Sequence, residues 1–173
     1  MALSLYAATI PTFQQILAAV SGLLDKAEAH YAETGVPLGD LMQARLADDM
    51  LPFGYQVKAT VIHSLGGIEG VRKGVFVPDM APFVGDFPAL RQLIVDAQSR
   101  LSNIDPDEIN SFEGRDTRFE FGEYRWDFAA EDFLLSFSQP NFHFHAATAY
   151  DILRAGGVQV SKVNYLGHMR LKS

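Results

Sequence analysis

The chain has 173 residues, 48% of them hydrophobic and 20% charged, which is the composition of one ordinary globular domain spanning residues 1–173. Fourteen Lys and Arg residues against 21 Asp and Glu residues give a formal net charge of −7. This acidic balance argues against nucleic-acid binding, because phosphate binding needs a basic surface. The lack of cysteine excludes disulfides, thiolate nucleophiles and thiolate metal ligands.

The N-terminal stretch MALSLYAATIPTFQ does not resemble a signal peptide. It has no basic region ahead of an apolar segment and no small-residue cleavage pattern. No run of about 18 apolar residues is present, so no membrane-spanning or membrane-bound segment is expected. A cytoplasmic location fits these features, although secreted bacterial proteins can also lack cysteine.

The first helix is predicted over Leu3–Glu33. Apolar residues recur there at three- and four-residue spacing and form a broad stripe typical of a core helix. Pro11 is tolerable only if the helix begins near it, which makes Thr9 a plausible N-cap. After a glycine- and proline-containing turn, Asp40 is expected to cap one short helical turn.

A second long helix is predicted over Pro52–Arg72, with Asp49 or Met50 leading into it and Pro52 in its first turn. Gln56, Thr60 and His63 share one face of this helix. The glycine pair at 66–67 weakens the helix by up to about 1 kcal/mol per glycine relative to alanine. The same pair would let another helix approach closely.

The segment Lys73–Pro88 loses the helical pattern and contains three prolines and two glycines, so it is predicted to be a long connection across a bundle. Asp86 is expected to cap a third helix that has Pro88 in its first turn. Beyond it, the partial alternation over Ile109–Trp126 indicates a β-hairpin or an extended loop turning near Gly114–Asp116. Two strands alone are marginal, so they must lie against helices.

Seven aromatic residues gather in and after the expected hairpin, and their predicted role is to form its packing surface. They are Phe119, Phe121, Tyr124, Trp126, Phe128, Phe133 and Phe137. A dimer surface is the alternative. An acidic chain with this aromatic content is compatible with an oligomer, and a homodimer is the expected assembly.

The last long helix is predicted over Gln139–Gly157, with Ser138 as its cap, Pro140 in its first turn and a glycine pair at its end. At about 100° per residue, Asn141, His145 and Thr148 fall on one face, whereas His143 projects away from it. Four long helices and one insert predict an all-α, four-helix bundle with a small β-hairpin or extended insert before the last helix.

A metal site is one hypothesis for the polar residues that face inward on the second and last helices. His63 and His145 would suit Zn, Ni or Fe, because imidazole is a borderline ligand. The third ligand would be Asn141, or His143 if the local helix is irregular. Further residues expected around the pocket are Gln56, Thr60, Thr148 and Tyr150. The alternative is that these are buried polar groups without a ligand.

Two stretches, DMLPFGYQVKATVIHS and PNFHFHAATAYDILRAGGVQVSKVNYLG, resemble a family of small bacterial proteins known as a domain of unknown function within the DinB/YfiT-like superfamily of metalloenzymes. The resemblance implies a four-helix bundle with an up-down-down-up chain path. It also implies three histidine ligands for a divalent metal, one on the second helix and two on the last. His63 and His145 match two of them, and Arg154 follows His145 by nine residues as in the superfamily. Asn141 stands at the third position and departs from the pattern.

Two functions follow from this resemblance. One is a metal-dependent transferase or hydrolase-like enzyme in which the ion activates a thiol or water. The other is a non-catalytic, small-molecule-binding or stress-associated dimeric protein that has lost the metal. The sequence does not decide between them, because a fold does not fix a function.

Overall fold

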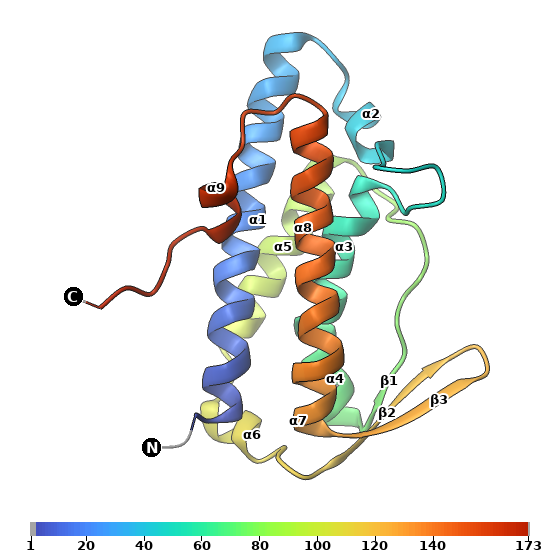
Figure 1. Cartoon of the computed structure of the whole chain (residues 1–173), viewed down its shortest axis with the longest axis vertical. Helices are drawn as coiled ribbons and strands as arrows, with labels where there is room; N and C mark the ends of the chain where they lie inside the picture. The colour runs from blue at the N-terminus through green and yellow to red at the C-terminus, as the bar shows by residue number, and fades with distance from the viewer. Residues whose placement is uncertain (1–2, 173) are drawn as a thin grey trace.

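Four helical stretches run side by side in the computed structural model, which describes residues 3–172 (Figure 1). They are α1 (Leu5–Thr34), α3 (Phe53–His63) continued by α4 (Leu65–Lys73), α5 (Phe87–Ser102) and α8 (Gln139–Ala155). In Figure 1, α1 and α8 ascend while α3–α4 and α5 descend. The chain path is therefore up-down-down-up, and the long connection from residue 77 to residue 86 is the crossover between the two descending stretches.

Shorter elements join these helices and make the molecule more than a four-helix bundle. The helical ones are α2 (Leu38–Gln43), α6 (Pro106–Asn110), α7 (Ala130–Asp132), the π-helical segment η1 (Phe133–Ser138) and α9 (Lys162–Leu166). The strands are β1 (Val75–Phe76), β2 (Asp116–Phe121) and β3 (Tyr124–Ala129). The fold is thus mostly helical with a small three-stranded sheet, and the all-α prediction was too narrow.

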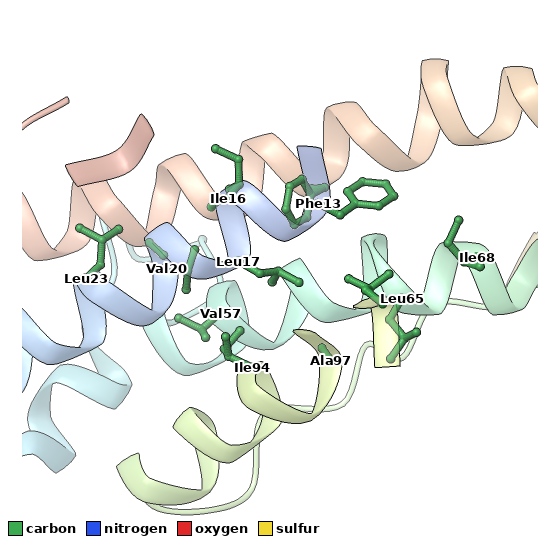
Figure 2. Packing of buried hydrophobic residues seen from close by; sticks show 14 of the residues in the cluster. Phe13, Ile16, Leu17, Val20, Leu23, Val57, Leu65, Ile68, Ile94 and Ala97 are labelled. Atoms are coloured by element: carbon green, nitrogen blue, oxygen red, sulfur yellow. The ribbon is translucent and has the colours of Figure 1, made fainter. Parts of the chain in front are cut away.

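The core lies between the long helices, as Figure 2 shows. Leu17 of α1, Val57 of α3 and Ile94 of α5 are all fully buried there. Helix α1 is long and apolar enough to cross a membrane by length and composition. However, half of its most apolar 18-residue stretch is buried in the molecule. The apolar stripe of α1 packs in the core of the molecule.

Helix α1 begins at Leu5, close to the predicted Leu3 and well before Pro11, so the predicted cap at Thr9 is wrong. The side chain of Ser4, not Thr9, caps it by accepting the main-chain N–H of Ala7. Pro11 therefore lies inside the helix. The neighbouring Ile10 and Phe13 are completely buried, so core packing offsets the hydrogen bond that the proline cannot make.

The predicted second helix is broken at Ser64, where φ and ψ are −106° and −87°. The Ser64 hydroxyl donates to the carbonyl of Thr60 at 2.6 Å. Close approach at the glycine pair is confirmed at Gly67, which lies against the side chain of Ser138. Ser138 does not cap α8 as predicted, because η1 runs directly into that helix and the Ser138 hydroxyl donates to the carbonyl of His63 at 2.7 Å.

The sheet has the order β1-β2-β3, with β1 parallel and β3 antiparallel to β2. The hairpin turns at residues 122–123, where Gly122 has φ of 54°, and not near Gly114 as predicted. Gly114 also has a positive φ, but it follows α6 and precedes β2. Both glycines suit a turn, and the weak alternation did not show which one joins the strands.

Candidate metal and ligand site

The site lies where α3 and α8 pack against each other. His63 is the last residue of α3, and His145 lies two turns into α8. Their ring centroids are 5.5 Å apart, and the ring planes are 13° from parallel. Two residues on helices far apart in the sequence are thus brought together as predicted.

A hydrogen-bonded chain fixes the orientation of His145. The Gln56 side-chain N–H donates to the carbonyl of Leu51 at 2.8 Å, which turns the Gln56 amide oxygen toward His145. This oxygen lies 2.7 Å from Nδ1 of His145. An oxygen acceptor requires a proton on Nδ1, so the neutral ring carries its lone pair on Nε2.

His63 is 6% exposed, and its ring packs against Phe76 and Phe137 with centroid distances of 5.6 and 5.9 Å. Its Nδ1 atom is buried and has no hydrogen-bond partner among the described residues. An unsatisfied buried polar atom costs about 1–3 kcal/mol. Such an atom is where a bound group would make a favourable contact.

Both imidazoles are held in their neutral form. Burial, and next the nearby His145, lower the pKa of His63 to about 3. Burial lowers the pKa of His145 to about 4. Protons therefore do not compete for the ring lone pairs near neutral pH, which is the state that metal binding requires.

Asn141 lies one turn before His145 on the same helix. Its side-chain N–H donates to the carbonyl of Phe137 at 2.8 Å, which leaves the amide oxygen as the free end of the side chain. Asparagine near the start of α8 thus contributes a neutral oxygen donor beside two nitrogens.

The three side chains open onto a pocket of about 240 Å³. Its lining residues are Leu51, Tyr55, His63, Pro78, Met80, Phe119, Phe121, Phe137, Asn141 and His145. No lining residue carries a formal charge when the histidines are neutral. The pocket is apolar apart from the two imidazoles, the Asn141 amide and the Tyr55 hydroxyl, which is 3.1 Å from the sulfur of Met80.

Sequence reasoning missed most of the apolar wall. The sequence predicts Phe119, Phe121 and Phe137 as part of the packing surface of the hairpin, and in the structure they also line the pocket. Pro78 and Met80 come from the crossover loop, whose path no periodicity indicates. The only sequence signal for this side of the pocket is the high content of aromatic residues after residue 118.

Several predicted pocket residues lie elsewhere. Thr60 and Thr148 are buried, and their hydroxyls donate to main-chain carbonyls of their own helices. Tyr150 packs edge-on against Tyr165, with ring centroids 6.1 Å apart, outside the pocket lining. His143 faces away as predicted, with Nδ1 3.2 Å from the Tyr165 hydroxyl, so the local helix does not offer it as a ligand.

The two imidazoles and the Asn141 amide line one pocket and are donor types that a divalent ion accepts, although together they make a weak set. Two imidazoles that share a tetrahedral ion at Zn–N distances of about 2.0–2.1 Å have ring centroids about 5 Å apart, near the 5.5 Å found here. Because imidazole lone pairs lie in the ring plane, two rings only 13° from parallel can reach one ion only if they lie edge to edge, almost in one plane. The bond from His145 Nδ1 to Gln56 also matches the outer hydrogen bond that metal-binding histidines make. However, residues 3–172 contain no group of three or more His, Asp or Glu residues placed to hold a metal. Asn141 would have to act as the third donor.

Comparison with known proteins agrees with this architecture. Residues 5–166 match the model of a family described as a domain of unknown function, DUF1993, and the chain belongs to that family. A crystal structure of a DinB family member protein from Shewanella denitrificans superposes with a TM-score of 0.81 at 26% identity, covering 98% of this chain and 95% of that one. The fold is therefore DinB-like. No curated protein matches the chain.

Proposed function

We propose that the pocket is a weak divalent-metal site of a DinB-like enzyme that acts on a small, largely apolar substrate. The observation that carries this proposal is the pair of neutral imidazoles that line an apolar pocket with their ring centroids 5.5 Å apart, one of them with a buried nitrogen that has no partner among the described residues. The likeness to a DinB family member supports the fold that would hold such a site.

Each polar residue has a distinct role in this proposal. His63 and His145 hold the ion from facing helices, and Asn141 adds a neutral oxygen one turn away on α8. Gln56 keeps the proton on His145 Nδ1 and so directs Nε2 to the ion. Because the three donors are neutral, they would leave the full charge of the ion uncompensated in an apolar site.

The uncompensated charge of the ion limits which substrates would suit the site. When bound, a divalent ion would lower the pKa of a thiol or water and favour its anionic form. The pocket offers no carboxylate, lysine or arginine as an additional base among the residues that line it. A thiol-containing substrate therefore suits the site, because its sulfur would supply the missing negative charge and the aromatic wall would exclude water from its apolar part.

A second candidate function is non-catalytic binding of a small organic molecule. It is favoured by the lining of the pocket, in which Tyr55, Phe119 and Phe137 supply flat apolar surface. In this case the unpartnered Nδ1 of His63 would bond to a single polar group on the ligand. The site would then select an aromatic or aliphatic molecule with one hydroxyl or carbonyl group.

Metal titration of untagged protein distinguishes the two functions. Isothermal calorimetry with Zn²⁺ and absorption spectra with Co²⁺ are measured for the wild type, His145→Ala and His143→Ala. The second variant is a matched control, because it removes an imidazole from the same helix outside the pocket. We expect one ion per wild-type chain, binding that is lost in His145→Ala, and unchanged binding in His143→Ala.

The opposite results are equally clear. Equal binding by the two variants would place the ion elsewhere, and no saturable binding by the wild type would exclude the metal site. Thermal-shift measurements with phenol, indole and benzyl alcohol then test the second candidate. Stabilisation by these probes without any effect of divalent ions would support the binding protein.

A further inference from the structure

Strand β3 forms an open edge of the sheet. The sheet order is β1-β2-β3, so β2 occupies one side of β3 and no described strand occupies the other. In Figure 1 the β2–β3 hairpin projects away from the long helices. An edge strand presents a row of main-chain donors and acceptors to any strand that approaches it.

The pairing of β2 with β3 determines which residues offer these groups. Arg118 is paired with Asp127, and the Arg118 main-chain N–H donates to the carbonyl of Gly74, on the β1 side, at 3.0 Å. In an antiparallel ladder both members of such a pair point their main-chain groups away from each other. Asp127, and by the same alternation Arg125, therefore direct their N–H and C=O groups to the open edge.

The sequence of β3 is chemically self-complementary. The five residues Tyr124–Phe128 read aromatic, positive, aromatic, negative, aromatic. If a second copy of β3 aligns antiparallel about a two-fold axis at Trp126, Arg125 lies opposite Asp127 of the partner subunit, and Tyr124 lies opposite the partner's Phe128. Arg125 and Asp127 are the residues with outward main-chain groups, so this register satisfies the hydrogen-bond pattern as well as the charges.

Neighbouring registers are unfavourable. An axis at Arg125 would place two arginines opposite each other, and an axis at Asp127 would oppose two aspartates, which is destabilising. An axis between two residues would place a residue whose main-chain groups point to the open edge opposite a partner residue whose groups point back to its own β2. Those groups could not form the regular hydrogen bonds of an antiparallel pair. Of the registers centred on residues 125–127, charge and hydrogen bonding therefore select the one centred on Trp126.

The same register continues two rows of side chains from one hairpin into the other. One row is charged and lies on one face of the sheet, and the other is aromatic and lies on the opposite face. Within one chain, Arg118 forms an ion pair with Asp127 at 2.6 Å, and Arg125 lies 3.5 Å from Glu120. Joining Asp127 to the partner's Arg125 gives a row of charges that alternate in sign over four strands. On the opposite face, Phe119 stacks on Trp126 with ring centroids 5.0 Å apart, and Trp126 is 47% exposed at the end of that aromatic row. A second copy would cover it.

We propose that two copies of this chain associate through β3 in this antiparallel register, forming one continuous six-stranded sheet. The docking surface is the edge of Tyr124–Phe128, and its occupant is the same edge of a second copy. Because Phe119 and Phe121 of the same hairpin line the pocket, the assembly would also brace one wall of the site.

Charge reversal tests the register directly. Arg125→Asp places a carboxylate opposite Asp127 of the partner subunit, and Asp127→Arg opposes two positive charges, in each case twice per dimer. We expect each variant to dimerise about tenfold or more weakly than the wild type in sedimentation velocity. A mixture of the two variants should form heterodimers with near wild-type affinity, because every charged pair between the two subunits is then of opposite charge. The like-charged pairs that remain lie within each hairpin, at Glu120 in Arg125→Asp and at Arg118 in Asp127→Arg.

Matched controls carry the same changes in net charge elsewhere. Lys162→Asp lies at the start of α9 and Glu33→Arg in the last turn of α1, and both residues are exposed. We expect wild-type dimerisation in both controls. Circular dichroism and thermal melting of every variant show whether the fold is retained. They also show whether each hairpin tolerates the like-charged pair that its variant creates, Arg118 opposite the new arginine in Asp127→Arg and Glu120 opposite the new aspartate in Arg125→Asp. We expect a small effect on the fold, because these side chains are largely open to solvent.

Trp126 gives a second, independent readout, because it is the sole tryptophan of the chain. Dilution of the dimer should shift its emission to longer wavelength as the ring becomes exposed. A wild type that stays monomeric up to about 300 µM would overturn the proposal. So would a dimer that is unaffected by either reversal, or a mixture of variants that stays monomeric while both remain folded.

Discussion

The hydroxyl of Ser138 donates to the main-chain carbonyl of His63 at 2.7 Å and so attaches the start of α8 to the end of α3 beside the site. The contact depends on Gly67, against which the Ser138 side chain lies. A Cβ atom at position 67 would collide with the Ser138 hydroxyl and lie 3.8 Å from Leu134. The spacing of the two helices that carry the imidazoles is therefore set partly by a glycine.

Gly67→Ala should destabilise the protein by about 1–3 kcal/mol, the usual cost of inserting an atom into a packed interior. Gly66→Ala is the matched control, since a Cβ there meets only the Val61 carbonyl oxygen at 3.6 Å. That variant should be neutral or more stable by up to about 1 kcal/mol, because alanine favours helix. Urea denaturation measures both, and equal effects of the two substitutions would contradict the close contact.

Completing the donor set should strengthen metal binding. Asn141→His replaces a neutral amide oxygen by a third imidazole at a position that lines the pocket with His63 and His145. We expect at least tenfold tighter Zn²⁺ binding and a Co²⁺ spectrum with the stronger visible bands of a tetrahedral site. Calorimetry and absorption spectroscopy are the measurements.

Asn141→Ser controls for loss of the bond from Asn141 to Phe137 without adding a ligand nitrogen. It should bind Zn²⁺ no more tightly than the wild type. If Asn141→His folds normally but leaves the affinity unchanged, then the amide does not face the same ion as the two histidines.

Acid should destabilise the metal-free protein through its buried histidines. The pKa of His63 is about 3 in the folded state against 6.5 for the free side chain. Between these values the unfolded chain binds more protons than the native one, so the free energy of unfolding falls as the pH decreases from 6.5 toward 3. Above the pKa of His63 in the unfolded chain, the side chain is neutral in both states and this loss of unfolding free energy is absent.

His63→Leu isolates this effect. The wild type should lose up to about 1.4 kcal/mol per pH unit through His63 in this range, and the variant should have a correspondingly smaller slope. Urea denaturation at several pH values between about 5 and 7, with a chelator present, gives both slopes. Parallel slopes would show that His63 is not the group responsible.

The helical part of the fold was predictable because its signals are local. Asp86 caps α5 by accepting the Ala89 N–H at 2.9 Å, as its position before Pro88 indicated. The inward face with Asn141 and His145 followed from helical periodicity alone. By contrast, β1 has two residues and pairs with a strand far along the chain, Val75 with Arg118, so no local pattern reports it.

The site divides in the same way. His63 and His145 could be paired from sequence because both lie on long helices with well-defined buried faces. Met80 and Phe121 come from the crossover loop and the hairpin, and their positions depend on tertiary packing. The sequence predicts Gln56 as a pocket residue, but in the structure it does not line the pocket and instead bonds to His145. That bond depends on the carbonyl of Leu51, which the sequence does not place.

That bond leads to a test of how His145 is oriented. Gln56→Leu removes the acceptor of the Nδ1 proton while keeping similar volume, so the buried N–H is left unsatisfied. The cost should be about 1–3 kcal/mol of stability. In ¹⁵N NMR spectra, the His145 ring should change from the Nδ1-protonated form to a mixture of tautomers, since the other ring nitrogen then competes for the proton.

Gln15→Leu is the matched control, because it removes a side-chain bond to the Leu166 carbonyl at 2.8 Å, in another part of the molecule. It should lower the stability without altering the His145 spectrum, and an Nδ1-protonated ring in both variants would mean that Gln56 does not select the tautomer.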